Sequence, residues 1–186
     1  MSSATKSVAC LGFLTVVEHA ELGLLGGYLL LNPAGRPLEF HCTAPVKANR
    51  AQEILYGPTL RPYLYGEQIG QTLLTRSKLT PLVVCTDSEP VLAARDFTHV
   101  PLVWVRPNSE CRIQNAEKEP GSDFCVLNSE FSLARNRVAV APHYSSDEAA
   151  IRQVWPTQAD GLDLLEPFAR IREALEEAQK SVRTAA

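Results

Sequence analysis

One short apolar run constrains the fold of this chain more than any other feature. Residues 80–86 read Thr-Pro-Leu-Val-Val-Cys-Thr, and a helix-like pattern begins directly afterwards, over residues 88–97. A continuous apolar run of this kind is typical of a strand that is buried on both faces, as in a parallel sheet. A buried strand followed at once by a helix favours an α/β fold in which helices cover the sheet.

The segments before this run predict a three-stranded antiparallel meander. Residues 8–17 and 28–31 are rich in the residue types that strands prefer. The segment Asn-Pro-Ala-Gly-Arg at 32–36 has the composition of a tight turn, which leads into a third strand over residues 37–45. Alternation in this third strand predicts two faces, one with Leu38, Phe40 and Cys42 and the other with Glu39, His41 and Thr43.

A helical region follows the meander. Asn49 and Gln52 have the spacing of a capping box, and Gly57 followed by Pro58 predicts the end of this first short helix. Apolar residues resume their helical spacing after Thr59, interrupted by a proline and two glycines. We therefore expect a short helix, a break, and a second helix to about Thr75.

A further strand over residues 99–107 completes the order β-β-β-α-β-α-β, which implies a mixed sheet. Ser145 and Glu148 have the spacing of another capping box, which predicts the start of a short helix. We expect a single α/β domain over residues 1–186, with a core at about 8–107, a polar insert at 106–123, and C-terminal strands and helices over 124–182.

Residues 164–182 have the most regular pattern in the chain. Apolar residues are spaced four and three apart, at Leu164, Phe168, Ile171, Leu175, Ala178 and Val182. This spacing predicts an amphipathic helix, with Pro167 in its first turn. The helix either packs on its own domain or forms the contact of a homodimer.

Composition excludes some classes of protein. The net charge is −3 with a pI of about 5.8, which counts against a large nucleic-acid surface. No apolar run reaches the length of a membrane span, and Glu18 and His19 follow the first apolar run where a signal peptide would have its cleavage site.

The five cysteines indicate a reducing compartment. Their number is odd, no Cys-x-x-Cys occurs, and Cys111 and Cys125 at the polar insert form a poor disulfide or metal site by themselves. We therefore expect a cytoplasmic protein.

Short motifs carry a resemblance to a known family. They are Gly26-Gly27-Tyr28, Asn49-Arg50 with Glu53, Thr86-Asp87-Ser88, and Trp104-Val105-Arg106. In these motifs and in its strand order, the chain resembles the ribonuclease H-like superfamily over about residues 12–107.

The resemblance implies phosphodiester hydrolysis at a pair of Mg²⁺ ions held about 3.5–4 Å apart by clustered carboxylates. It implies Asp87, Glu18 and Glu53 as catalytic residues, with Asp87 and Glu18 as metal ligands. The family's aspartate in the first strand has no counterpart, because residues 8–17 contain no carboxylate and Glu18 follows only at the strand's end.

Two functions are compatible with these residues. The first is a cytoplasmic, non-catalytic interaction or regulatory domain, which needs no cofactor and binds partners through residues 56–70 or the terminal helix. In that case Asp87 or Ser88 simply caps the next helix. The alternative is a Mg²⁺-dependent nuclease that acts on nucleic acid through Asp87, Glu18 and Glu53.

Overall fold

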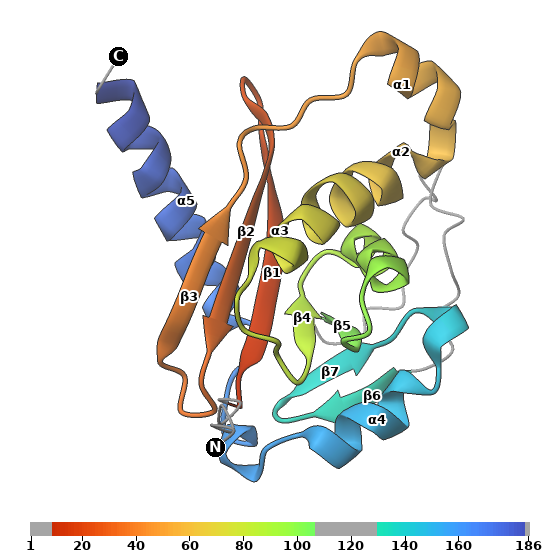
Figure 1. Cartoon of the computed structure of the whole chain (residues 1–186), viewed down its shortest axis with the longest axis vertical. Helices are drawn as coiled ribbons and strands as arrows, with labels where there is room; N and C mark the ends of the chain where they lie inside the picture. The colour runs from red at the N-terminus through yellow and green to blue at the C-terminus, as the bar shows by residue number, and fades with distance from the viewer. Residues whose placement is uncertain (1–8, 107–129, 185–186) are drawn as a thin grey trace, which may run out of the picture.

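The computed structural model describes residues 9–106 and 130–184, and it describes side chains as far as residue 180. Its centre is a seven-stranded mixed sheet in the order β3-β2-β1-β4-β5-β7-β6 (Figure 1). The strands are β1 (Leu11–His19), β2 (Gly23–Leu31), β3 (Pro37–Cys42), β4 (Val84–Thr86), β5 (Leu102–Val105), β6 (Glu130–Leu133) and β7 (Asn136–Ala139). The expected mixed α/β fold is confirmed.

The first three strands form the predicted antiparallel meander. The side chain of Asn32 shapes the turn between β2 and β3, because its Oδ1 accepts hydrogen bonds from the N–H groups of Ala34 and Arg36 at 3.0 and 2.9 Å. Gly35 has a φ of +79°, which glycine adopts without strain. β3 lies at one edge of the sheet and has a bulge opposite Leu30 and Leu31.

Three central strands, β1, β4 and β5, run parallel. Leu14 of β1 pairs with Thr86 of β4, and Thr86 in turn pairs with Trp104 of β5. The carboxyl ends of the three strands therefore lie along one side of the sheet, where the residue after each strand is available to a site.

Helical segments cover both faces of the sheet. They are α1 (Arg50–Tyr56), η1 (Gly57–Thr59), α2 (Leu60–Pro62), η2 (Tyr63–Gln71), α3 (Thr72–Arg76), η3 (Glu89–Phe97), η4 (Pro142–Tyr144), α4 (Asp147–Val154), η5 (Thr157–Ala159) and α5 (Glu166–Thr184). One buried cluster joins the sheet to η2 and η3, and a second joins its other face to α4 and α5. Figure 1 shows α1 standing away from the sheet, beyond the end of α2.

Several predicted elements are confirmed. Asn49 and Gln52 form the capping box of α1, and Gly57 follows its last residue. The terminal helix α5 buries Phe168, Ile171 and Leu175 against the sheet, while the side chain of Val182 lies outside the described side chains.

Other predictions differ from the structure in detail. The second helix is not a regular α-helix, since η2 within it has π-helical hydrogen bonding, and η3 is a 3₁₀-helix. The capping box at Ser145 and Glu148 is wrong: α4 starts at Asp147, and the Ser146 side chain at its N-cap makes no capping hydrogen bond. The side chain of Asp147, the first residue of α4, is buried and forms an ion pair with Arg95.

Two glycines of β2 allow the helices to approach the sheet closely. A Cβ on Gly26 would lie 2.2 Å from Ile69 of η2, and one on Gly27 would lie 2.3 Å from Ile171 of α5. The pair therefore fixes how near each helical layer comes to the central strands.

None of the helices in the described part of the chain is long and apolar enough to cross a membrane. Most of the polar insert predicted at 106–123, together with Cys111 and Cys125, falls in 107–129, outside the described residues.

Candidate functional site

Asp87 follows the last residue of β4 and forms an ion pair with Arg172 of α5, through its Oδ2. Alternation along β4 explains the direction of its side chain, because Val83 and Cys85 lie in the cluster that α5 covers. The Asp87 side chain is only 11% exposed, and its buried Oδ1 has no hydrogen-bond partner among the described residues.

The helix-capping role predicted for Asp87 or Ser88 is wrong. Ser88 occupies the N-cap position of η3, but its side chain makes no capping hydrogen bond. The helix η3 covers one face of the sheet, and the Asp87 side chain points towards the other face, where it forms an ion pair with Arg172 of α5. In the turn before η3, the Ser88 N–H donates a hydrogen bond to Thr86 Oγ1 at 3.2 Å.

A threonine, Thr15, stands beside Asp87 on the neighbouring strand. Leu14 pairs with Thr86, so Thr15 and Asp87 follow one residue further along the two parallel strands. Thr15 is fully buried, and its Oγ1 has no hydrogen-bond partner in the described part of the chain. The position next to Asp87 therefore carries a hydroxyl and no carboxylate.

Glu18, the predicted partner of Asp87, lies on the other face of the sheet. Its Oε1 accepts a hydrogen bond from the Tyr65 hydroxyl and pairs with Arg61 Nη2 at 3.0 Å. Tyr65 belongs to the cluster under η2 and η3, and Asp87 faces α5. Alternation along β1 causes this separation. Glu18 lies on the same face as Leu14, whereas Thr15 lies on the opposite face, beside Asp87.

The contact with Tyr65 alters the acidity of both groups. The hydrogen bond from Tyr65 lowers the pKa of the Glu18 carboxyl below its usual range, with a smaller contribution from Arg61. Burial, and then the hydrogen bond to Glu18, raises the pKa of Tyr65 to about 12. Both changes keep Glu18 charged and Tyr65 protonated at neutral pH.

The third predicted residue, Glu53, lies on α1. Its Oε2 pairs with Nη1 of Arg50 at 3.0 Å, and α1 has no buried residue. The structure thus places the three predicted carboxylates apart, each beside a different arginine. Their catalytic roles stay predictions.

The residues at Asp87 do not fit the Mg²⁺ pair that the resemblance implies. Mg²⁺ prefers several oxygen ligands, and a pair of ions needs clustered carboxylates. In residues 9–106 and 130–184, no group of three His, Cys, Asp or Glu side chains lies close enough to hold a metal ion. Asp87 has an arginine and a threonine as neighbours instead.

Sequence reasoning missed Thr15 and Arg172. The signal for Thr15 was present, because it is a lone polar residue in an apolar strand that neighbours β4 in the expected topology. Arg172 had no signal of its own, because its contact joins segments far apart in the sequence.

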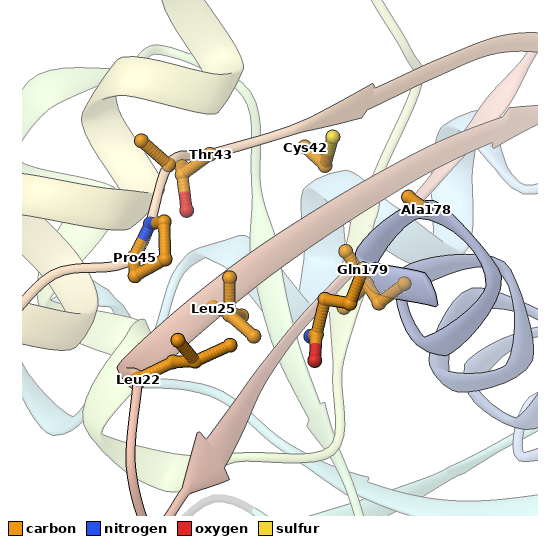
Figure 2. Close-up of a pocket in the computed structure, with 9 residues that line it drawn as sticks. Leu22, Leu25, Cys42, Thr43, Pro45, Ala178 and Gln179 are labelled. Carbon is orange, nitrogen blue, oxygen red and sulfur yellow. The ribbon is translucent and has the colours of Figure 1, made fainter. Parts of the chain in front are cut away.

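An apolar cavity of about 380 Å³ lies elsewhere, between α5 and the ends of β2 and β3. Figure 2 shows Ala178 and Gln179 of α5 near one side of it and Leu22, Leu25 and Pro45 near the other. The full lining is Leu22, Leu25, Cys42, Thr43, Ala44, Pro45, Leu175, Ala178 and Gln179.

Comparisons with known proteins give structural matches alone. No protein-family model and no curated protein matches the chain. The chain is similar to a crystal structure of human ENDOV, with 14% identity and a TM-score of 0.46 over 96% of this chain and 89% of the other.

Two further solved structures are similar. Endonuclease V of Ciona intestinalis, in complex with a 23mer DNA that contains an inosine followed by a ribo-adenosine, has 12% identity and a TM-score of 0.49, covering 94% and 88% of the two chains. The catalytic domain of human endonuclease V has 18% identity and a TM-score of 0.47, covering 97% and 85%. At these values the similarity assigns no residue and no reaction to this chain.

Proposed function

We propose that this chain is a non-catalytic binding domain of ribonuclease H-like architecture. The observation that carries the proposal is the environment of Asp87. Its carboxylate is held by Arg172, and its neighbour on β1 is Thr15. An arginine that is hydrogen-bonded to a carboxylate balances its charge without a metal ion.

An exposed apolar surface on α1 supports a binding role. Ile54 and Leu55 are 66% and 82% exposed, and α1 contributes no residue to the core. Tyr56 and Tyr63 stack beside them, with ring centroids 4.1 Å apart. Exposed apolar residues on an element that stabilises little of the fold are typical of a contact surface. This surface falls within and beside the segment 56–70 that the sequence favours.

A metal-dependent nuclease acting through Asp87, Glu18 and Glu53 is the second candidate. The observation that favours it is the position of Asp87 at the carboxyl end of β4, because ligands of open α/β sheets bind at such strand ends. The solved structures that the chain matches are of endonuclease V, one of them with DNA bound. Nucleic acid is the ligand, and Mg²⁺ the cofactor, that this candidate requires.

A cleavage assay separates the two candidates. The full chain is incubated with labelled single- and double-stranded DNA and RNA in Mg²⁺ or Mn²⁺, beside the variants Asp87→Asn and Asp160→Asn. We expect no metal-dependent cleavage by any of the three. Cleavage that is lost in Asp87→Asn and kept in Asp160→Asn would establish the nuclease, since Asp160 is an exposed aspartate that hydrogen-bonds Trp155.

Membership of the ribonuclease H-like superfamily, the single-domain organisation and the cytoplasmic location stay predictions. The strand order β3-β2-β1-β4-β5, with β1, β4 and β5 parallel, supports the first of them. The free thiols of Cys10, Cys42 and Cys85 support a reducing environment.

A further inference from the structure

We propose that two copies of this chain pair along the outer edge of β3, with Phe40 on the two-fold axis and Leu38 of each copy entering the apolar cavity of the other. The proposal goes beyond the binding role proposed above and does not depend on the chemistry of Asp87. It rests on the exposed face of β3, on the directions of its backbone groups and on the charges that a two-fold pairing brings together.

β3 is an edge strand whose apolar side chains are exposed. Leu38 and Phe40 are 39% and 40% exposed, and Cys42 is exposed as well. Their alternation follows the sequence prediction, but the polar residues between them, Glu39 and His41, are the more buried ones. An edge strand with an uncovered apolar face is a template for pairing with another strand.

The backbone of β3 has its free hydrogen-bonding groups in the same place. The N–H of Thr43 donates to the carbonyl of Gly26 at 3.0 Å, so this residue directs its backbone groups towards β2. Hydrogen-bonding direction alternates along an antiparallel strand. The backbone groups of Cys42 and Phe40 therefore point outwards, and neither residue is a proline, so both can donate to a second strand.

Charge complementarity selects the register. When Phe40 faces Phe40 of a second copy, Leu38 lies near Cys42 and Glu39 faces His41. A register centred on Glu39 sets two carboxylates opposite each other, which is destabilising. One centred on His41 sets two imidazoles opposite each other and leaves Glu39 facing a threonine. Within one chain Glu39 Oε2 lies 3.0 Å from His41 Nε2 and also accepts hydrogen bonds from the Ser77 hydroxyl and the Lys78 N–H. The central register adds an imidazole of the second copy opposite each of these carboxylates.

The same register explains the cavity. Cys42 lines it together with Leu175 and Ala178 of α5. Leu38 is the extra residue at the bulge of β3, so in this register it lies near Cys42 of the second copy without a regular ladder partner, and its exposed side chain is close to the mouth of this space. Figure 1 shows the C-terminal end of α5 extending beyond the arrowhead of β3, where it would cover the second copy's strand. Because the pairing is two-fold symmetric, Leu38 of each copy fills the cavity of the other, and the same contact occurs twice.

Disulfide cross-linking tests the register. Residues opposite each other in a hydrogen-bonded antiparallel pair have Cα atoms about 5.5 Å apart, within the range that a disulfide spans. The variant Phe40→Cys is made in a chain with Cys42, Cys111 and Cys125 changed to serine, and it is oxidised with diamide. We expect a covalent dimer from this variant, and a much slower reaction from Leu38→Cys in the same background.

Restoring Cys42 beside Leu38→Cys should restore rapid cross-linking, because those two positions lie near each other across the axis. Equal rates for Phe40→Cys and Leu38→Cys in the serine background, or no dimer from either, would overturn the proposal.

Light scattering during size-exclusion chromatography tests the surface without cysteine chemistry. We expect the unmodified chain to approach the mass of a dimer as its concentration rises, Phe40→Glu to stay a folded monomer by circular dichroism, and Phe97→Glu to dimerise like the parent. Phe97 is 45% exposed, about as much as Phe40, and lies at the end of η3, outside the β3 edge. A parent chain that stays monomeric at all concentrations, or a Phe40→Glu variant that still dimerises, would contradict the proposal.

Discussion

Arg172 of α5 binds the carboxylate of Asp87 at the end of β4. The contact joins the terminal helix to the centre of the sheet and uses the predicted catalytic carboxylate that directly follows β4. This ion pair belongs both to the packing of α5 and to the candidate site. A substitution of Arg172 or Asp87 therefore tests the stability of the helix and the role of the site.

Arg172→Met should lower the free energy of unfolding by about 1–3 kcal/mol, because it leaves a mostly buried carboxylate without its charged partner. Asp87→Asn should cost less, since Arg172 is 47% exposed and can be solvated. Urea unfolding of both single variants and of the double variant gives the interaction energy. Additive effects would show that the pair contributes nothing to stability.

The buried ion pair between Arg95 and Asp147 should be the most sensitive polar contact described. Its hydrogen bonds measure 2.7 and 3.1 Å, and the two side chains are 15% and 7% exposed. Asp147→Ala should destabilise the fold by about 3–5 kcal/mol, because it leaves a buried guanidinium unpaired.

Glu148→Ala is the matched control for this change, as it removes an exposed pair with Arg152 on the same helix. It should cost at most about 0.5 kcal/mol. Thermal unfolding of the two variants compares them, and similar losses of stability would refute the distinction.

Gly27→Ala should destabilise the fold by about 1–3 kcal/mol, because its new methyl group meets Ile171 and must displace α5. Gly161→Ala should change the stability by less than about 0.5 kcal/mol, since a Cβ there has nothing within 4 Å. Chemical unfolding measures both. Equal tolerance at the two positions would mean that α5 does not pack closely on β2.

Tyr65 should titrate at about 12 in the folded chain, and Glu18→Gln should lower this pKa by removing the nearby negative charge. An unfolded tyrosine titrates near pH 10, so the buried, protonated Tyr65 and its hydrogen bond to Glu18 stabilise the fold fully below about pH 10, and this contribution is lost as the pH rises towards 12. NMR of ¹³Cζ-labelled tyrosine follows the titration, with Tyr65→Phe for assignment.

Glu53→Gln is the control for the titration, because Glu53 pairs with Arg50 on α1 and is not among the groups that shift the pKa of Tyr65. Equal shifts in Glu18→Gln and Glu53→Gln would exclude a specific contact between Glu18 and Tyr65.

The succession of strands and helices along the chain was predictable because it depends on local patterns. The apolar run before Asp87, the turn at Asn32 and the spacing along α5 each reflect which residues can be buried. The capping box of α1 was found for the same reason, since both of its hydrogen bonds join residues three apart.

The site could not be predicted in the same way. Whether Glu18 and Asp87 share a face depends on the register between β1 and β4, and one residue of shift exchanges the faces. Arg172 lies far away in sequence, and an arginine on an amphipathic helix is ordinarily a solvated residue. The ion pair of Asp147 was not predicted because its partner, Arg95, lies 52 residues away in the sequence.

Binding of Mn²⁺ to the full chain, followed by the loss of the free-ion EPR signal, tests the central claim most directly. The proposal that Asp87 is held by Arg172 and serves no metal predicts the same titration for the parent chain and for Asp87→Asn. A saturable Mn²⁺ site in the parent that disappears in Asp87→Asn would contradict it and establish Asp87 as a metal ligand.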